Sequence, residues 1–457
     1  MAQSEFEAKS PIKVENRGSV NQTLRRGETL VFDMASPNDS RLCHLPTEIL
    51  IEIIKLLPSF SSLWSLINAF PRFNSIFLSV PFEIFEHFLR KETPPCIQAL
   101  MRVALVARIS PSWFADRRDV TKYMSRYKTF DHYFDALSER TKEPELALKV
   151  ALVVRDMVET AHKIHAVAHA CLDYYVEKSM TIKPECWHDG LPSFDHSKLG
   201  NQPEGRPIQP KPSGPPTYLE EQILIRLLWR LQVFIELRTA NRQKNLEHWS
   251  EDNRRSIQIW FMDYLFHAFT PISNTQEMFR TYNDTWNPYC EKDQFSSLME
   301  FVIHVTAGDT KLKPGLWELE NFLKNLPPKI YDGCYHATCL PPKPISETRR
   351  GLMTTDDILP ATVSIDEMIE KPPAGWRLHD EMVSDRRHHY SSVPFEPYRR
   401  YGFAFWQAER MANLGFDYHE RPGFDESDAP KRYFVWHSVL RGVDMSSRYG
   451  HPHEVTQ

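Results

Sequence analysis

The sequence predicts a mainly α-helical protein, and three segments carry this prediction. Between residues 146 and 171, apolar residues recur at helical spacing along one side of a long helix. Between residues 224 and 235, six apolar side chains fall within about 120° of one another on a helix, which is the width of a core-facing stripe. Residues 45–77 are rich in apolar side chains and are interrupted by Pro58 and Pro71, where helices end or begin. We therefore expect almost entirely helix, with few short strands.

The first helix is expected to begin near Pro46 and to stop at Pro58. Proline suits the first helical position because its missing N–H would have had no acceptor, and Glu48 in the first turn complements the helix dipole. The apolar residues of this helix cover well over half of its circumference, whereas a surface helix needs a stripe of only about 100°. The apolar surface beyond such a stripe must be covered by other parts of the same protein or by a second chain. These apolar residues are Ile49, Leu50, Ile51, Ile53, Ile54, Leu56 and Leu57.

Two more short helices are expected directly after the first. Ser61 or Ser62 is expected to cap the second helix, and Pro71 to open the third. Three short helices in about 35 residues make a core too small to be stable alone. The unit is therefore completed by a partner or by the rest of the chain. Its apolar residues are Leu63, Leu66, Ile67 and Phe70 in the second helix and Phe73, Ile76 and Phe77 in the third.

At these positions the segment resembles an F-box, and the stretch LINAFPRFNSIF is similar to the F-box-like proteins of filamentous fungi. The resemblance implies a three-helix F-box-like unit that docks on the Skp-family adaptor of a cullin-RING ubiquitin ligase. Phe73 also matches the F-box pattern. The other matched residues are the partner-binding residues that the resemblance implies: Leu45, Pro46, Glu48, Ile49, Leu50, Ile53, Leu57, Leu63 and Leu66.

The chain is expected to divide at changes in composition. A flexible tail of residues 1–40 precedes the F-box-like domain, residues 41–80, and a large irregular helical domain follows. Eight prolines between residues 184 and 216 exclude helix and central strand, so a proline-rich loop or linker is expected at residues 184–217. The helical domain then has a first part, residues 81–183, and a second part with the C-terminal region, residues 218–457.

Helices of the first part are expected at residues 82–89, 96–109, 123–137 and 145–178. In the second part they are expected from Tyr218 onward, at residues 251–269, 295–305 and 316–326, and between Gly402 and Gly415. The patterns of residues 217–265 and 398–416 are also similar to those of the fungal F-box-like proteins.

Composition excludes several classes of protein. The net charge of −5 and the pI near 6.5 give no basic field for nucleic acid or an anionic membrane. Seven irregularly spaced cysteines fit reduced thiols, and we expect a cytoplasmic or nuclear location. No segment has the length and apolarity of a signal peptide or a membrane span, so no membrane partner is expected.

One cluster of candidate metal ligands has two interpretations. His162, His165, His169 and Asp173 lie within about 80° on one helix and offer imidazoles at metal-ligand spacing; the simpler interpretation is the solvated face of an amphipathic helix. The segment CYHATC, residues 334–339, supplies half of a zinc site without a second pair of ligands. Nucleotide-binding and hydrolase motifs are missing from the sequence, so we assign no catalytic residue, metal or cofactor.

The leading hypothesis is therefore a non-catalytic adaptor that recruits an unknown protein substrate to a Skp-cullin-F-box type ubiquitin ligase. The alternative is a helical structural or protein-interaction protein whose F-box-like unit is buried in its own core and has no ligase role. A third hypothesis is an enzyme that uses the C-terminal histidines, which requires a pocket where at least three of them converge. Burial of the first helix distinguishes the first two.

Overall fold

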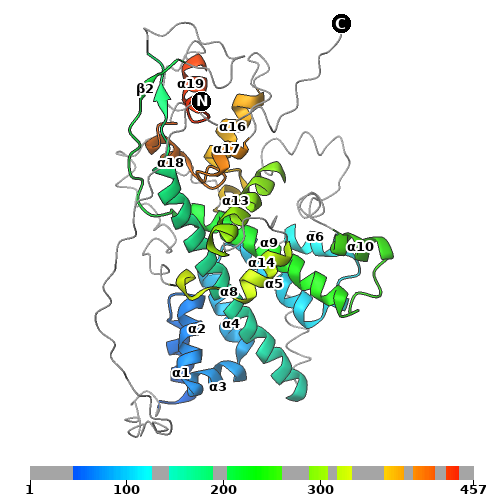
Figure 1. Ribbon diagram of the computed structural model, residues 1–457. Helices are drawn as coiled ribbons and strands as arrows, with labels where there is room; N and C mark the ends of the chain where they lie inside the picture. Colours follow the sequence, from blue (N-terminus) through cyan, green and yellow to red (C-terminus); the bar gives the residue numbers. More distant parts are fainter. Residues whose placement is uncertain are drawn as a thin grey trace, which may run out of the picture. The chain divides into compact units, whose positions relative to one another are not determined.

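The computed structural model confirms the mainly α-helical fold (Figure 1). It describes residues 45–125, 144–188, 203–259, 288–306, 316–331, 365–384, 395–416 and 429–441. Of the described residues, 73% are helical and 2% lie in strands. The chain divides into two units, residues 1–46 and residues 47–457, and every helix and strand named below belongs to the second. The predicted tail, residues 1–40, lies outside the described residues.

The first group of helices follows the predicted order, and four of them begin with a proline, whose fixed φ and missing N–H suit the first helical turn. The helix predicted at residues 123–137 is described only as far as Ser125. The elements are α1 (Thr47–Lys55), α2 (Phe60–Ala69), α3 (Pro71–Ser79), α4 (Pro81–Glu92), α5 (Pro95–Ile109), the 3-10 turn η2 (Pro111–Trp113), α6 (Arg117–Ser125) and α8 (Pro144–Ser179).

A pair of two-residue strands, β1 and β2, separates this group from the rest. The strands are antiparallel, with Glu185 opposite Pro207 and Cys186 opposite Arg206. They lie in the two described parts of the proline-rich segment, residues 184–188 and 203–217. The elements are β1 (Glu185–Cys186), β2 (Arg206–Pro207), α9 (Tyr218–Arg242), α10 (Glu251–Ile259), α13 (Pro288–Thr306), α14 (Leu316–Lys324), η3 (Pro328–Ile330), α15 (Ile365–Glu370), α16 (Ala374–Ser384), α17 (Glu396–Arg399), α18 (Ala408–Asn413) and α19 (Ala429–Ser438).

The 36-residue helix α8 contacts elements from both groups. It packs against α2, α3, α4 and α5 on the N-terminal side of the sequence, and against α9 and α13 on the C-terminal side. Its predicted apolar side is largely buried, including Val150, Met157, Ile164 and Cys171. Since a buried apolar side chain contributes about 1.5–3 kcal/mol, this side of α8 holds the N-terminal helices to the rest of the unit.

Helix α9 is enclosed on nearly all sides, which differs from the single predicted stripe. The six stripe residues between Leu224 and Ile235 are buried, as predicted, but Ile223, Val233 and Leu237 are buried as well. The helix begins with a capping box, in which the Thr217 hydroxyl accepts from the Glu220 N–H and the Glu220 carboxylate accepts from the Thr217 N–H. Helices α5, α8, α10, α13 and α15 all contact α9, so it is the central element of the described fold.

Six charged side chains of α9 pair with residues of five other helices. This pattern follows from burial, because a buried charge is costly unless it is paired. Arg410 of α18 donates to both carboxylate oxygens of Glu220, at 3.0 Å each. The other pairs are Glu221 with His165 and His169 of α8, Arg226 and Arg230 with Glu291 of α13, Glu236 with Arg108 of α5, and Arg242 with Glu320 of α14.

The helix predicted between Gly402 and Gly415 is wrong in its first half. Residues 400–405 form turns, residues 406–407 have no regular structure, and only Ala408–Asn413 is helical. Gly402 has a φ of +82°, and a Cβ there would lie 2.5 Å from the Trp406 ring, so the turn packs its own aromatic residues tightly. Gly415, with a φ of +94°, does end the helix as predicted.

In the part of the chain that the structure describes, no helix has the length and apolarity to cross a membrane.

The buried pair of Glu220 and Arg410 gives the first testable prediction. Arg410→Met leaves the Glu220 carboxylate buried without its partner, so we expect the free energy of unfolding to fall by about 3–5 kcal/mol. Urea unfolding measures this loss. The matched control is Arg255→Met, which breaks the exposed pair with Glu251 and should cost less than about 1 kcal/mol. Equal losses in the two variants would contradict the role given to the buried pair.

Candidate functional site

The candidate docking unit consists of α1, α2 and α3, whose ends are set by local signals. Ser59 caps α2, and its hydroxyl accepts from the Ser62 N–H at 3.2 Å. The predicted cap at Ser61 or Ser62 is therefore wrong by two or three residues, because the chain turns immediately after Pro58 and starts α2 at Phe60. Pro71 opens α3 as predicted. All three helices belong to the same compact unit as α4 and α8, which they contact.

One face of α1 is buried against α3 and α4. Leu50 and Ile54 are fully buried on this face. Leu63 of the next helix, α2, is fully buried as well. Phe60 of α2 lies 5.6 Å, between ring centroids, from both Phe85 and Phe88 of α4. Leu50 and Leu63 are thus core residues of this conformation, and their side chains cannot contact a partner directly.

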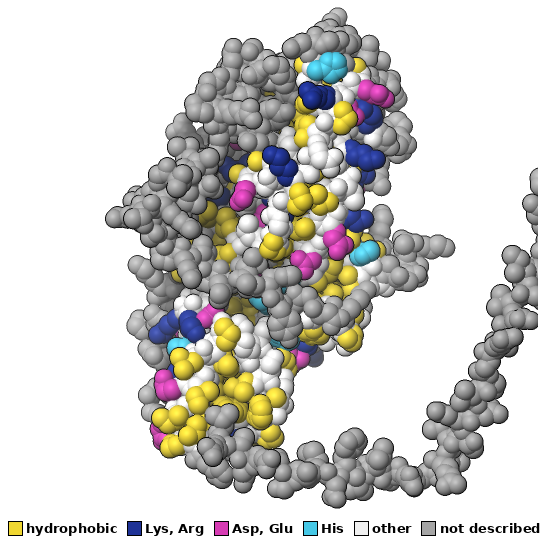
Figure 2. Space-filling view, turned by 90° about the vertical axis from the view of Figure 1, so that its left-hand side faces the viewer, with side chains coloured by type: hydrophobic (Ala, Val, Ile, Leu, Met, Phe, Trp, Pro, Cys, Tyr) yellow, Lys and Arg dark blue, Asp and Glu magenta, His cyan; other side chains and the backbone are white. Residues whose placement is uncertain are grey.

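A neighbouring face of α1 leaves apolar side chains in solvent. Ile49 is 48% exposed and Leu56, which directly follows α1, is 79% exposed; Ile53 between them is half-buried. Their spacing of i, i+4 and i+7 places these three residues on one face. Figure 2 looks on the side where α1 and α2 are drawn in Figure 1 and shows hydrophobic side chains gathered over these helices. We call Ile49, Ile53 and Leu56 the outer face of α1.

The remaining residues that the F-box resemblance assigns lie in varied surroundings. Glu48 is exposed on α1, and Leu57 and Leu66 are half-buried. Leu45 is half-buried and Pro46 is exposed. The assignment did not include Leu56 or Phe70, although both are among the most exposed large apolar side chains that the structure describes. The helical spacing from Ile49 to Leu56 is the sequence signal that could have found Leu56.

A cavity of about 890 Å³ lies beside this unit. Leu57, Leu66 and Phe70 line it from the α1–α2 segment and α2. Its other walls include His165 of α8 and Trp229 of α9. Residues of the candidate docking unit and of the two long helices α8 and α9 therefore line the same cavity.

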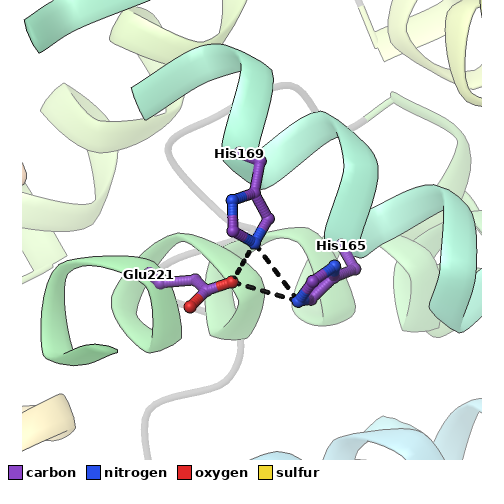
Figure 3. Close-up of side chains that lie close together, drawn as sticks. All are labelled: His165, His169 and Glu221. Carbon is purple, nitrogen blue, oxygen red and sulfur yellow. Dashed lines mark hydrogen bonds and ion pairs between the residues drawn. The ribbon is translucent and has the colours of Figure 1, made fainter. Parts of the chain in front are cut away.

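A cluster of two histidines and one glutamate lies beside this cavity (Figure 3). His165 and His169 come from successive turns of α8, and Glu221 comes from α9; all three point toward one another. The two Nε2 atoms are 3.3 Å apart, and Glu221 Oε1 lies 3.1 Å from His165 Nε2 and pairs with His169 Nε2. Burial alone would raise the pKa of Glu221, but the two imidazoles hold it at about 2, so this carboxyl is ionised.

The solvated-face interpretation of these histidines is wrong for His169, which is buried. The packing of α9 against α8 covers it, and this contact between distant segments has no signal in the local pattern. His162 does not join the cluster: its ring stacks on Tyr331 at a centroid distance of 5.2 Å. Asp173, the fourth residue of the predicted group, is half-buried one turn beyond His169. Glu221, which the sequence interpretation missed, completes the cluster instead.

The buried cysteines among the described residues offer no activated nucleophile. Cys96, Cys171 and Cys290 are buried, and burial raises the pKa of each thiol, which disfavours the thiolate. The CYHATC segment, residues 334–339, lies outside the described residues. Of the C-terminal histidines, His379 packs among the rings of Phe395 and Tyr398.

Comparison with known proteins gives no assignment. No family model matches the chain, and no curated protein or solved structure matches it either.

The two faces of α1 should respond differently to truncation. Leu50→Ala removes a fully buried side chain and should lower the free energy of unfolding by about 2–5 kcal/mol. Ile49→Ala removes a half-exposed side chain from the same helix and should cost less than about 1 kcal/mol. Urea unfolding of both variants checks the assignment. A loss for Ile49→Ala as large as that for Leu50→Ala would mean that the outer face is packed in solution.

Proposed function

We propose that this chain is a non-catalytic adaptor that recruits a protein substrate to a cullin-RING ubiquitin ligase of the Skp-cullin-F-box type. The supporting observation is the outer face of α1, where Ile49 and Leu56 remain 48% and 79% exposed. The F-box resemblance places the contact with a Skp-family adaptor on this same helix. The protein would act in the cytosol or nucleus, without nucleic acid or membrane as partner.

The exposure of α1 favours this proposal over the self-buried alternative. A structural unit sealed into its own protein has no need of apolar side chains in water, and their exposure costs about 25 cal/mol per Å². In this chain, α1 contacts α3 and α4, and Leu50 and Ile54 are fully buried, whereas Ile49 and Leu56 on its outer face remain exposed. An amphipathic helix that presents spaced apolar anchors is a common mode of protein recognition.

The charges around the outer face indicate what the partner surface should offer. Glu48 and Glu52 are exposed beside the apolar residues, while Lys55 pairs with Glu52 and Glu83 at 2.9 and 2.8 Å. A partner groove that is apolar at its centre, with a basic or neutral rim, would match this arrangement. The apolar centre supplies the affinity, and the rim charges chiefly set orientation and rate of association.

The mechanism would be proximity rather than chemistry. The helices of α1–α3 are held to the remaining helices through α4 and α8, so a substrate bound to the rest of the chain would be held near the ligase. Holding two reactants on one body replaces a bimolecular encounter by an effectively local one. The residues of this chain would position the substrate and leave the transfer of ubiquitin to the ligase.

The direct test is binding of a purified Skp-family adaptor to the full chain. Ile49→Ser with Leu56→Ser should weaken binding more than tenfold, since each buried apolar side chain is worth about 1.5–3 kcal/mol and 1.4 kcal/mol is a factor of ten. A second variant, Leu45→Ala with Pro46→Ala, tests two residues that the resemblance assigns to the contact but that precede α1 and its outer face. Titration calorimetry measures both variants.

The matched control is Leu148→Ser with Leu152→Ser, which removes two exposed leucines of α8. This variant should bind the adaptor as the unmodified chain does, and all variants should keep the same urea midpoint. An unmodified chain that does not bind the adaptor, or a control variant that loses binding equally, would reject the proposal.

A further inference from the structure

The cluster of His165, His169 and Glu221 has the donor set of a transition-metal site. Two histidines at i and i+4 on one helix face are a common pair of zinc ligands, and a carboxylate oxygen is a common third. Bond lengths of 2.0–2.1 Å and tetrahedral angles place neighbouring ligand atoms about 3.3 Å apart. The Nε2–Nε2 distance is 3.3 Å, and the distance from His165 Nε2 to Glu221 Oε1 is 3.1 Å. The third pair, His169 Nε2 and Glu221 Oε1, lies closer together than this, so these two atoms must move apart when the ion binds.

The three ligand atoms sit on rigid elements. His165 and His169 lie in the middle of α8, and Glu221 lies in the first turns of α9, which pack directly against each other. The His169 and Glu221 side chains are 4% and 3% exposed, whereas the His165 side chain is 24% exposed and lines the 890 Å³ cavity. The cluster is thus buried on one side and reached from the cavity on the other.

The polar atoms of the cluster are also incompletely satisfied. No hydrogen bond of good geometry reaches Glu221 Oε1, although both Nε2 atoms lie against it. The two Nε2 atoms also face each other, and only one proton fits between them. Two imidazole nitrogens and a carboxylate oxygen therefore converge on one point in a buried place, which is a set of atoms that can hold a divalent cation once the imidazoles are deprotonated at Nε2.

We propose that His165, His169 and Glu221 bind a divalent transition-metal ion of the zinc class, with the fourth coordination position open to water from the cavity. Imidazole and carboxylate ligands suit Zn²⁺ and Co²⁺, and three protein ligands plus water is the usual arrangement of an open zinc site. The ion would join α8 to α9 beside the candidate docking unit. This inference is independent of the ligase proposal, since it uses none of the outer-face residues.

The test is a titration of the chelator-treated full chain with Co²⁺, whose visible absorption reports tetrahedral coordination. We expect one equivalent bound without a thiolate charge-transfer band, because the site contains no sulfur ligand. Excess Zn²⁺ should displace the Co²⁺, and the melting temperature should rise on addition of either ion. Glu221→Gln and His165→Gln should each weaken binding by about 100-fold or more, since even changes outside the first coordination shell cost roughly 10–100-fold.

The matched control is His162→Gln, on the same helix one turn before His165, which should keep full Co²⁺ binding. His165 is the more exposed histidine of the cluster, so His165→Gln should unfold at the same urea concentration as the metal-free unmodified chain. This variant therefore tests metal binding even if Glu221→Gln lowers the stability of the fold. Failure of the unmodified chain to bind Co²⁺ would overturn the proposal and leave an ion-pair cluster only. Equal binding by His165→Gln, or loss of binding in the His162 control, would overturn it as well.

Discussion

The structure depends on a single constraint: the buried charges of α9 must be paired. An unpaired charge in a protein interior costs several kcal/mol, so each buried carboxylate or guanidinium fixes the position of its partner. Glu220 requires Arg410 of α18, and Glu236 requires Arg108 of α5, although 190 and 128 residues separate the partners. The apolar residues of α9 supply the free energy of burial, and the charges specify which helices surround it.

This constraint explains which parts of the fold were predictable. The helices α1 to α5, α8 and α9 follow from apolar spacing and from proline positions, since both signals are local. The burial of α9 on its polar side was not predictable, because the partners of its charged residues come from distant segments. Local patterns show that Glu220 is polar, but not that Arg410 will cover it.

The two candidate sites were likewise predictable only in part from the sequence. The surplus of apolar residues on α1 was visible in the sequence, but the division into a buried face with Leu50 and an outer face with Ile49 required the packing of α3 and α4. His165 and His169 share one helix, so their spacing was visible too. Glu221 was missed because the contact between α8 and α9 brings it there. The error at residues 400–407 has a similar origin, since buried aromatic residues hold most of that segment in turns.

The two sites are neighbours without sharing a residue. Leu57 and Leu66, which the F-box resemblance assigns, and His165 of the cluster line the same cavity. A partner that contacted this edge of α2 would therefore lie close to the proposed ion. The central helix α9 is buried and its charges are paired, whereas α1 leaves Ile49 and Leu56 exposed.

Native-state hydrogen exchange tests the central role of α9 most directly, because it reports the opening free energy of each helix separately. Amides of α9 should exchange only through global unfolding, with a denaturant dependence equal to that of complete unfolding. Amides of α1 should exchange through smaller openings and be less protected. Amides of α9 that exchanged as readily as those of α1 would contradict the account.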